Sequence, residues 1–537
     1  MTNRLLLIIV AALVVVAAIV VALAYTFFDL GLTPNTSGGL RVALSSFSAE
    51  TLDPSLDNQD GLKYHGHLYD HLAGVNGEGR LDTRFGLISD WEVSPTADAF
   101  TLTIRENAQW HDGKPVIAED VRTSLEYYFR DDATCGVCGN VKSAVAGVDV
   151  VDNRNVTLRL ASPDVVFMGL LAPVEGDMPL LPAHVLGDNP SALNTAPIGS
   201  GPWLYGSKSL GESVHFESNA VYWNAERISP FDTLDITLVP EEPQRIALLE
   251  AGSVDIAPIG TDAFEHVREN DYRIDGPKHV VSTALRFFMS YDTDFLTSSL
   301  EFRKALAIGV NMPEIVASAY PPEAASVATG SALFTPVSPG YIEDLPTYPY
   351  DPDEARAQLA QSGYAGETVK LISLVAYGLS EMPLINEMIV EDWREVGINA
   401  EVVPTEWPAV QPLFMPRPQL FDDFAPAPVL HGAQPSRPGG DINSVRRYMS
   451  GADGAMLTYY APDVADAMLN QIQAAVNDDE RNLTLQALNR KTYAEFWAIP
   501  IFWRHDTYAV KQTLIGWQPT NGTSSDLHFE TITRLAQ

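Results

Sequence analysis

Helices that lead into strands through short glycine turns recur along this chain, and this pattern restricts the fold class most strongly. Asp351 is suited to cap a helix with Pro352 at its first position and Gly363 just beyond its end. A second helix is predicted to stop at Gly397 and to lead into a strand over residues 398–403. Such alternation predicts mixed α/β lobes.

The same patterns occur earlier in the chain. Apolar residues at helical spacing predict a helix over residues 121–129, after a turn at residues 112–115. Another helix begins near Pro243 and ends at Gly252, and a strand follows over residues 254–256.

Length and charge limit the architecture and the partners. The 537 residues are too many for one hydrophobic core, so at least two lobes are expected. Acidic residues outnumber basic ones by 69 to 34, which gives a formal net charge of -35. A field of this sign disfavours nucleic acid and anionic lipid head groups, since both are polyanions. The simpler explanation of the negative net charge is solubility or adaptation to salty surroundings.

The N-terminus predicts export. Arg4 precedes an uncharged apolar run from Leu5 to Phe28, and residues 22–24 supply the small side chains of a cleavage site. The run also has the roughly 20 residues needed to span a bilayer if it is not cut. Residues 1–38 are therefore expected to form a signal peptide or a membrane anchor plus a linker, and the remainder is expected in the periplasm.

The chain has two cysteines, Cys135 and Cys138. In an exported protein such a pair is expected to form a small local disulfide. A redox-active pair would follow a thioredoxin-like strand-to-helix pattern, which is missing here, and a zinc site would need a second pair of ligands. Because closing so short a loop adds little stability, we interpret the disulfide as a staple of the loop.

Common catalytic signatures are missing from the sequence. It has no Gly-x-Ser-x-Gly elbow and no zinc-binding His-Glu-x-x-His helix. The nearest match to a phosphate loop, residues 201–206, has Ser207 where a lysine is required. His65, His67 and His71 resemble a metal cluster, but a polar surface or core edge is the simpler interpretation. We expect no enzyme, no cofactor and no metal.

Several short motifs follow one another in a fixed order between Ser45 and Trp503. They are residues 87–93, 110–115 with 118–121, 197–203, 219–223, 252–256 and 302–306. Together they resemble the peptide, dipeptide and nickel class, family 5, of extracellular solute-binding proteins of bacterial ABC transporters. The block Trp-His-Asp-Gly-Lys-Pro with Ala-Glu-Asp-Val is the most specific part of this resemblance.

Most of these motifs have a structural interpretation that does not depend on the family. Gly199 and Gly201 are predicted at a tight crossing where a side chain would clash. Trp91, Trp110 and Trp223 are interpreted as apolar anchors that pack in the interior. The motifs therefore describe the scaffold better than the ligand.

The resemblance implies an α/β, two-lobed periplasmic-binding-protein fold of class II, cluster C type, with an extra inserted domain. The lobes would close about a hinge around the ligand. Closure needs only a higher affinity of the ligand for the closed state. The implied division is lobe I from 39–80, 195–285 and 495–537, the inserted domain from 81–194, and lobe II from 286–494.

Candidate ligand-binding residues follow from the same resemblance. Peptide-binding members carry an aspartate late in lobe II that pairs with the ligand's amino group, but residues 424–435 of the matching stretch contain no carboxylate. The proline-rich segment 414–440 is instead predicted to form a binding loop. Arg437, Arg446 and Arg447 could hold a ligand carboxylate or simply offset surface acidity. The candidates are Ser45, Ser46, His431, Gln434, Arg437 and Asp441.

The implied function is the substrate-binding component of an ABC importer. A monomer would capture a small peptide or peptide-like solute outside the cytoplasmic membrane and deliver it to the permease subunits. Two alternatives stay open. One is a membrane-tethered sensor or chaperone on the same fold, and the other is a non-peptide solute such as an opine, an oligosaccharide or a metal chelate.

Overall fold

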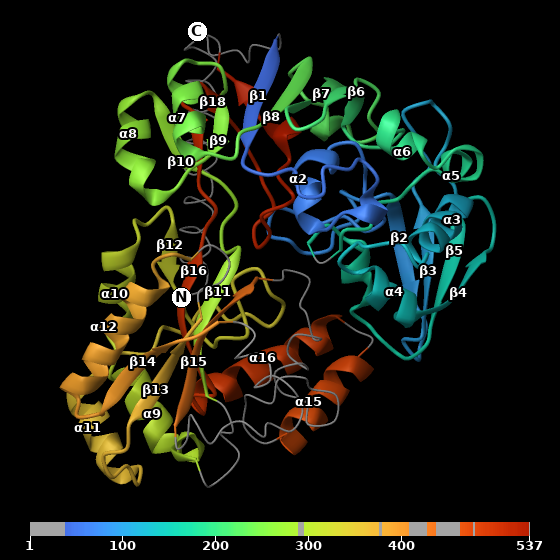
Figure 1. Ribbon diagram of the computed structural model, residues 1–537. Helices are drawn as coiled ribbons and strands as arrows, with labels where there is room; N and C mark the ends of the chain where they lie inside the picture. Colours follow the sequence, from blue (N-terminus) through green and yellow to red (C-terminus); the bar gives the residue numbers. More distant parts are fainter. Residues whose placement is uncertain are drawn as a thin grey trace, which may run out of the picture.

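The computed structural model describes residues 38–174, 176–287, 295–374, 379–406, 427–436, 462–475 and 478–535. Their strands form a seven-stranded, a six-stranded and a four-stranded sheet and one short pair, and these sheets lie in separate parts of the molecule (Figure 1). Within these ranges no helix is both long and apolar enough to cross a bilayer. The expected signal or anchor, residues 5–28, lies outside them.

The seven-stranded sheet is built around the first strand. β1 runs parallel to both of its neighbours, β8 and β9. In spatial order the strands are β10 (Tyr272–Asp275), β17 (Tyr508–Lys511), β9 (Ile256–Pro258), β1 (Gly39–Leu44), β8 (Thr233–Leu238), β7 (Ser213–Ser218) and β6 (Trp203–Ser209). The nearby helices are α2 (Leu62–His65), α7 (Glu242–Glu250) and α8 (Phe264–Glu269).

The six-stranded sheet is formed mainly by later residues. Its strands, in spatial order, are β12 (Ala325–Val327), β16 (Ala498–Arg504), β11 (Val281–Phe287), β15 (Pro428–Pro435), β13 (Val369–Ser373) and β14 (Ala400–Pro404). The helices of this part are α9 (Leu300–Ile308), α10 (Met312–Ala319), α11 (Pro352–Gln361), α12 (Met382–Glu395), α15 (Pro462–Ala474) and α16 (Asp478–Ala494).

The four-stranded sheet is antiparallel and lies to one side of the other two (Figure 1). In spatial order its strands are β2 (Ile88–Val93), β3 (Ala99–Ile104), β5 (Asn155–Leu160) and β4 (Val145–Val150). Its helices are α3 (Ala118–Tyr128), α4 (Cys138–Ala144), α5 (Ala183–Asp188) and α6 (Ala192–Thr195). The short pair is β18 (Leu514–Ile515) with β19 (Thr533–Arg534).

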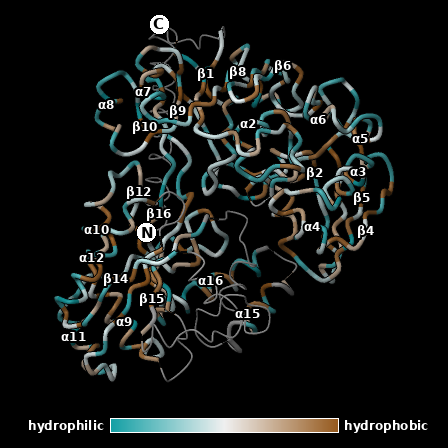
Figure 2. Tube along the Cα trace, viewed as in Figure 1, coloured by the Kyte–Doolittle hydropathy of each residue, from teal (hydrophilic) through white to brown (hydrophobic). Residues whose placement is uncertain are grey.

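Strand β1 contributes to two apolar cores. Val42 packs in a cluster shared with the four-stranded sheet, whereas Ala43 belongs to the cluster that contains Leu285 and Trp393 of the six-stranded part. Adjacent residues of a strand point to opposite faces, so one strand serves both cores. Figure 2 shows hydrophobic residues along the strands around β14 and β15.

The local signals of the sequence predict several elements correctly. The Asp351 side chain accepts the backbone N–H of Glu354 at the start of α11, and Gly363 follows the helix with φ +84°. The predicted helix over residues 121–129 is α3. The predicted strand at 254–256 is shifted, since β9 begins only at Ile256.

The block around Trp110 is held together by its own hydrogen bonds. Trp110 Nε1 donates to Asp120 Oδ2 at 3.1 Å, and the backbone N–H groups of Ile117 and Ala183 donate to the same carboxylate, each at 2.8 Å. Gly113 closes the turn between the two halves with φ +81°. This motif therefore fixes the start of α3, as its turn chemistry predicts.

The tight crossing predicted at Gly199 and Gly201 is confirmed. A Cβ on Gly199 would overlap the carbonyl oxygen of Leu68, and one on Gly201 would lie 2.6 Å from the carbonyl oxygen of His67. Only glycine lets two backbones approach this closely.

Two extended segments connect the seven-stranded and six-stranded sheets. One leads from β10 to β11, and the other leads from β16 to β17. In the second, the N–H of His505 donates to Ala324 O and the N–H of Asp506 donates to Pro277 O. Because β11 pairs with β16, residues 281–285 and 498–504, which the expected division assigned to lobe I, lie in the six-stranded sheet.

Candidate functional site

A cavity of about 350 Å³ opens where the chain crosses between these two sheets. It lies at the carboxyl ends of the parallel strands β1 and β9, the edge at which open α/β sheets bind ligands. Its lining comes from three regions: Leu44, Ser45 and Ser46 with Asp60 and Lys63; Pro258 and Ile259; and Arg504, Asp506, Thr507 and Tyr508.

The crossing segment is fixed at this cavity by backbone contacts. The N–H of Ile259 donates to Thr507 O at 2.9 Å, and Thr507 Oγ1 donates to Ile259 O at 2.6 Å. On the other side, the N–H of Val280 donates to Arg504 O at 2.9 Å. The segment from Arg504 to Tyr508 is thus hydrogen-bonded to residues next to a strand of each sheet, Ile259 beside β9 and Val280 beside β11.

The cavity is lined by charges of both signs. Lys63 Nζ forms an ion pair with Asp60 Oδ1 at 3.1 Å. Arg504 Nε is buried and has no hydrogen-bond partner within the described ranges. Burial raises the pKa of Asp506, whereas Lys63 and Arg504 act in the opposite direction.

Two of the predicted ligand-binding residues line this cavity. Ser45 and Ser46 follow β1 and are exposed. The Ser46 hydroxyl also accepts the backbone N–H of Ser48 at 3.0 Å. Arg437 and Asp441 lie outside the described residues.

The prediction of a binding loop is wrong for residues 428–435. They form β15, which pairs with β11 on one side and β13 on the other. His431 is fully buried there, with Nδ1 at 2.5 Å from Asn386 Oδ1, and burial together with Arg286 lowers its pKa to about 3. Gln434 Oε1 accepts a hydrogen bond from Arg286 Nη2 at 2.8 Å. Neither His431 nor Gln434 is among the residues that line the cavity.

The charged residues of the cavity were missed because they belong to no motif. One signal existed, since Arg504 and Asp506 directly follow the apolar run 498–503. A charge at the end of a buried strand is placed at a sheet edge, where functional side chains gather.

The three early histidines lie in the core, so of the two simpler interpretations the core location is confirmed and the surface location is wrong. His65, His67 and His71 are all buried, and α2 ends at His65. Burial lowers their pKa values to about 3, 4 and 4. Among the residues with described positions, no three His, Cys, Asp or Glu side chains are arranged to hold a metal ion.

A charged network lies beside these histidines, around a second cavity of about 40 Å³. Arg227 Nε donates to Glu530 Oε1 at 2.8 Å, and His528 Nε2 lies 2.9 Å from Asp526 Oδ2. Burial alone would lower the pKa of His528, but Asp526 and Glu530 outweigh it and raise the value to about 9. Since all four charges are paired, this network supports the scaffold.

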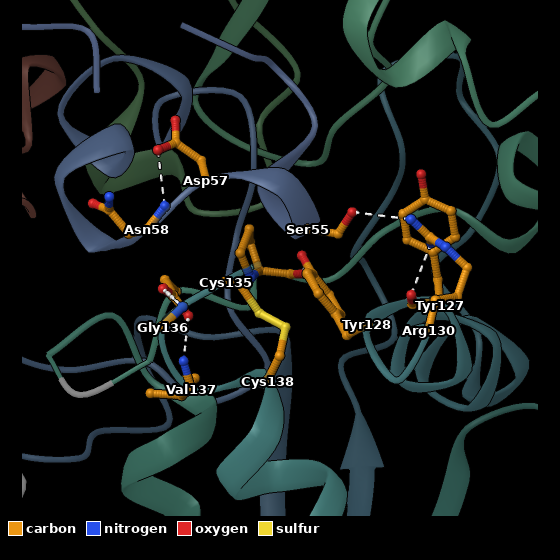
Figure 3. The surroundings of a disulfide bond; sticks show 12 residues. Ser55, Asp57, Asn58, Tyr127, Tyr128, Arg130, Cys135, Gly136, Val137 and Cys138 are labelled. Carbon is orange, nitrogen blue, oxygen red and sulfur yellow. Dashed lines mark hydrogen bonds between the residues drawn. A yellow bond between two sulfur atoms is a disulfide. The ribbon is translucent and has the colours of Figure 1, made fainter. Parts of the chain in front are cut away.

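Cys135 and Cys138 are joined in a disulfide within the loop that leads into α4 (Figure 3). The backbone N–H groups of Gly136 and Val137 both donate to the carboxylate of Asp177. The N–H of Thr134 donates to Ser55 O at 2.8 Å, which ties the stapled loop to the segment that continues to Asp60 and Lys63.

Known proteins similar to this chain share its fold. Heme-binding protein A of Haemophilus influenzae is 24% identical over 63% of this chain and 65% of its own length. The dipeptide-binding protein of Escherichia coli K12 is 25% identical over 60% of this chain and 63% of its own length, so the chain spans less than two thirds of either relative. The unliganded open form of the periplasmic murein tripeptide-binding protein MppA superposes with a TM-score of 0.80 at 15% identity, covering 94% of this chain and 99% of that one.

These likenesses confirm the predicted α/β, two-lobed periplasmic-binding-protein fold. The model of bacterial extracellular solute-binding proteins, family 5 Middle, matches residues 84–467, which is most of the chain. The chain therefore belongs to family 5 of the bacterial extracellular solute-binding proteins.

Proposed function

We propose that this protein is the extracytoplasmic substrate-binding component of an ABC importer. It captures a small peptide or peptide-like solute between two lobes, closes about the hinge, and delivers the solute to the membrane permease. No bond of the solute is made or broken. The observation that carries the proposal is the cavity of about 350 Å³ at the crossing between the two large sheets.

The cavity has the size and chemistry that such a role requires. Its volume falls within the roughly 300–1,000 Å³ typical of small-molecule sites. Hydroxyl groups and charges of both signs suit a polar, charged solute, as the names of the dipeptide-binding and tripeptide-binding relatives suggest by analogy.

We propose that the chain passes between the two lobes within the hinge, just before β11 and just before β17. Lobe I carries the seven-stranded sheet and lobe II the six-stranded sheet, with crossings between β10 and β11 and between β16 and β17. The four-stranded sheet forms the inserted domain within residues 81–194. Ligand that contacts both sides of the crossing favours the closed state, because only closure completes both sets of contacts.

The test is a binding screen on the exported protein. A panel of dipeptides and tripeptides is added in a thermal-shift assay, followed by small-angle scattering with any peptide that stabilises the protein. A peptide at 100 times its dissociation constant is expected to stabilise the fold by about 2.7 kcal/mol. The radius of gyration is expected to decrease on binding.

Two results would contradict this function. One is a screen in which peptides are inert while an opine, an oligosaccharide or a metal chelate stabilises the protein. The other is turnover of any bound compound. Stimulation of the ATPase activity of the reconstituted permease by loaded protein, and not by empty protein, separates an importer component from a sensor or chaperone.

A further inference from the structure

Arg504 and Asp506 present their side chains to the same cavity from the crossing segment. Both line it, whereas Trp503 and His505 pack against the ring of His279, with centroids at 5.2 and 5.0 Å. Alternate residues of an extended segment point to opposite sides. The crossing therefore buries an aromatic cluster on one face and offers a cation and an anion on the other.

Neither of these two side chains forms an ion pair or a side-chain hydrogen bond with another residue of the described ranges. Arg504 Nε is buried without a hydrogen-bond partner, and the Asp506 carboxylate is near enough to Arg504 and Lys63 for both to lower its pKa. Lys63 and Asp60, in the same cavity, do pair with each other. Leaving a buried donor on a charged group unpaired is unfavourable for folding, so such a group in a cavity points to a ligand.

We infer that Arg504 and Asp506 are the ligand-binding charges, and that the solute is a small zwitterion whose carboxylate binds Arg504 and whose ammonium binds Asp506. This inference rests on the proposed function and names the substrate class of its site. A guanidinium group presents Nε and one Nη as parallel donors, which match the two oxygens of a carboxylate. An aspartate accepts hydrogen bonds from an ammonium group in the same way.

The position of the two charges limits the size of the zwitterion. Arg504 and Asp506 are two residues apart in one segment and line one cavity of about 350 Å³. A ligand that pairs with both side chains there has its own two charges close together, as an amino acid or a short peptide does, whereas the ends of a long oligopeptide lie further apart. A solute with a charge of one sign only would leave the other side chain unpaired.

This arrangement couples recognition to closure. The segment from Arg504 to Tyr508 is hydrogen-bonded to both sheets, so a ligand that binds its side chains lies against the hinge. The two lobes can then close over a ligand whose charges are already satisfied at the hinge.

The experiment combines ligand chemistry with two variants. Calorimetry measures the affinity of dipeptides, including alanylalanine, in three forms: free, N-acetylated and C-amidated. The proteins are the wild type, Arg504→Gln, Asp506→Asn and Arg504→Lys. The matched controls are Arg159→Gln and Asp149→Asn, an exposed ion pair of the four-stranded sheet.

The wild type is expected to bind free dipeptides at least about tenfold more tightly than either blocked form. Arg504→Gln is expected to weaken binding of the free dipeptide about 10- to 100-fold and to leave binding of the C-amidated form unchanged. In Asp506→Asn, N-acetylation of the dipeptide is expected no longer to weaken binding, while C-amidation still weakens it. The affinity of Arg504→Lys for the free dipeptide is expected to lie between those of Arg504→Gln and the wild type. The controls bind like the wild type.

Two outcomes overturn the inference, and they are distinguishable. If dipeptides bind but the blocked forms bind equally well, or if the variants do not change the discrimination, only the assignment of the two charges fails. If no form of any dipeptide or free amino acid binds the wild type, the assignment and the proposed peptide function fail together. A thermal midpoint of each variant within a few degrees of the wild type shows that folding is intact.

Discussion

Replacing Asp120 with alanine tests whether the most specific motif of the chain is a structural clamp. The Asp120 carboxylate accepts hydrogen bonds from Trp110 Nε1 and from the backbone N–H groups of Ile117 and Ala183. Trp110 and Asp120 are each 2% exposed, so water cannot replace the acceptor at the indole. Ile117 and Ala183 are half-buried, so water can partly replace it at the two backbone groups.

The magnitude follows from these three donors. A buried donor that loses its acceptor costs about 1–3 kcal/mol, and the indole is expected to lie near the top of this range. The two backbone donors add a smaller amount each. Burial raises the pKa of Asp120, because the buried carboxylate has lost its hydration. Removing the carboxylate also removes this unfavourable desolvation, which offsets part of the lost stability. The expected destabilisation is about 3–5 kcal/mol.

The assay is hydrogen exchange of the α3 amides, followed by mass spectrometry. A protein with several lobes need not unfold in one step, and exchange reports the opening of α3 itself. Glu119→Ala is the control, because Glu119 lies next to Asp120 in the first turn of α3 but is only half-buried, and its carboxylate pairs with the exposed Arg122. The control is expected to cost less than about 1 kcal/mol. A loss below about 1 kcal/mol in Asp120→Ala, or equal losses in both variants, would refute the clamp.

Three further predictions concern the scaffold. Gly199→Ala drives a Cβ into a backbone carbonyl and is expected to destabilise the fold by about 1–3 kcal/mol in thermal unfolding. The control is Gly139→Ala in α4, where the Cβ meets open space, and it is expected to be neutral or stabilising. Equal effects of the two substitutions would count against the tight crossing. Replacing Cys135 and Cys138 with serine is expected to lower the free energy of unfolding by less than about 2 kcal/mol, because the closed loop is so short. A larger loss, measured by thermal unfolding, would show that the disulfide stabilises more than this loop. The pKa of His528 is raised from 6.5 to about 9 in the folded state, so its stabilisation is complete below pH 6.5 and is lost as the pH rises through 9. Thermal midpoints measured from pH 6 to 10 should show this loss, and His528→Gln should flatten it; an unchanged profile would contradict the ion network.

Local structure and the fold family could be predicted from the residues alone. The cap at Asp351, the turn at Gly113 and the close approach at Gly199 depend on φ angles and hydrogen bonds within a few residues, or on the lack of a side chain. Such signals are short-range, so they can be recognised before any pairing of strands is known. The order of the motifs then identified the two-lobed architecture.

The location of the candidate site depends instead on how the sheets pair and pack. The proline-rich stretch around His431 forms a strand because neighbours on both sides satisfy its backbone, and its prolines 428 and 435 fall at its ends. One of the early histidines, His67, packs against Phe529 of the C-terminal segment. Arg504 and Ser45 line the same cavity only because β11 pairs with β16 while β1 pairs with β9. Pairings between residues so far apart depend on the packing of whole sheets, which no local pattern of residues specifies.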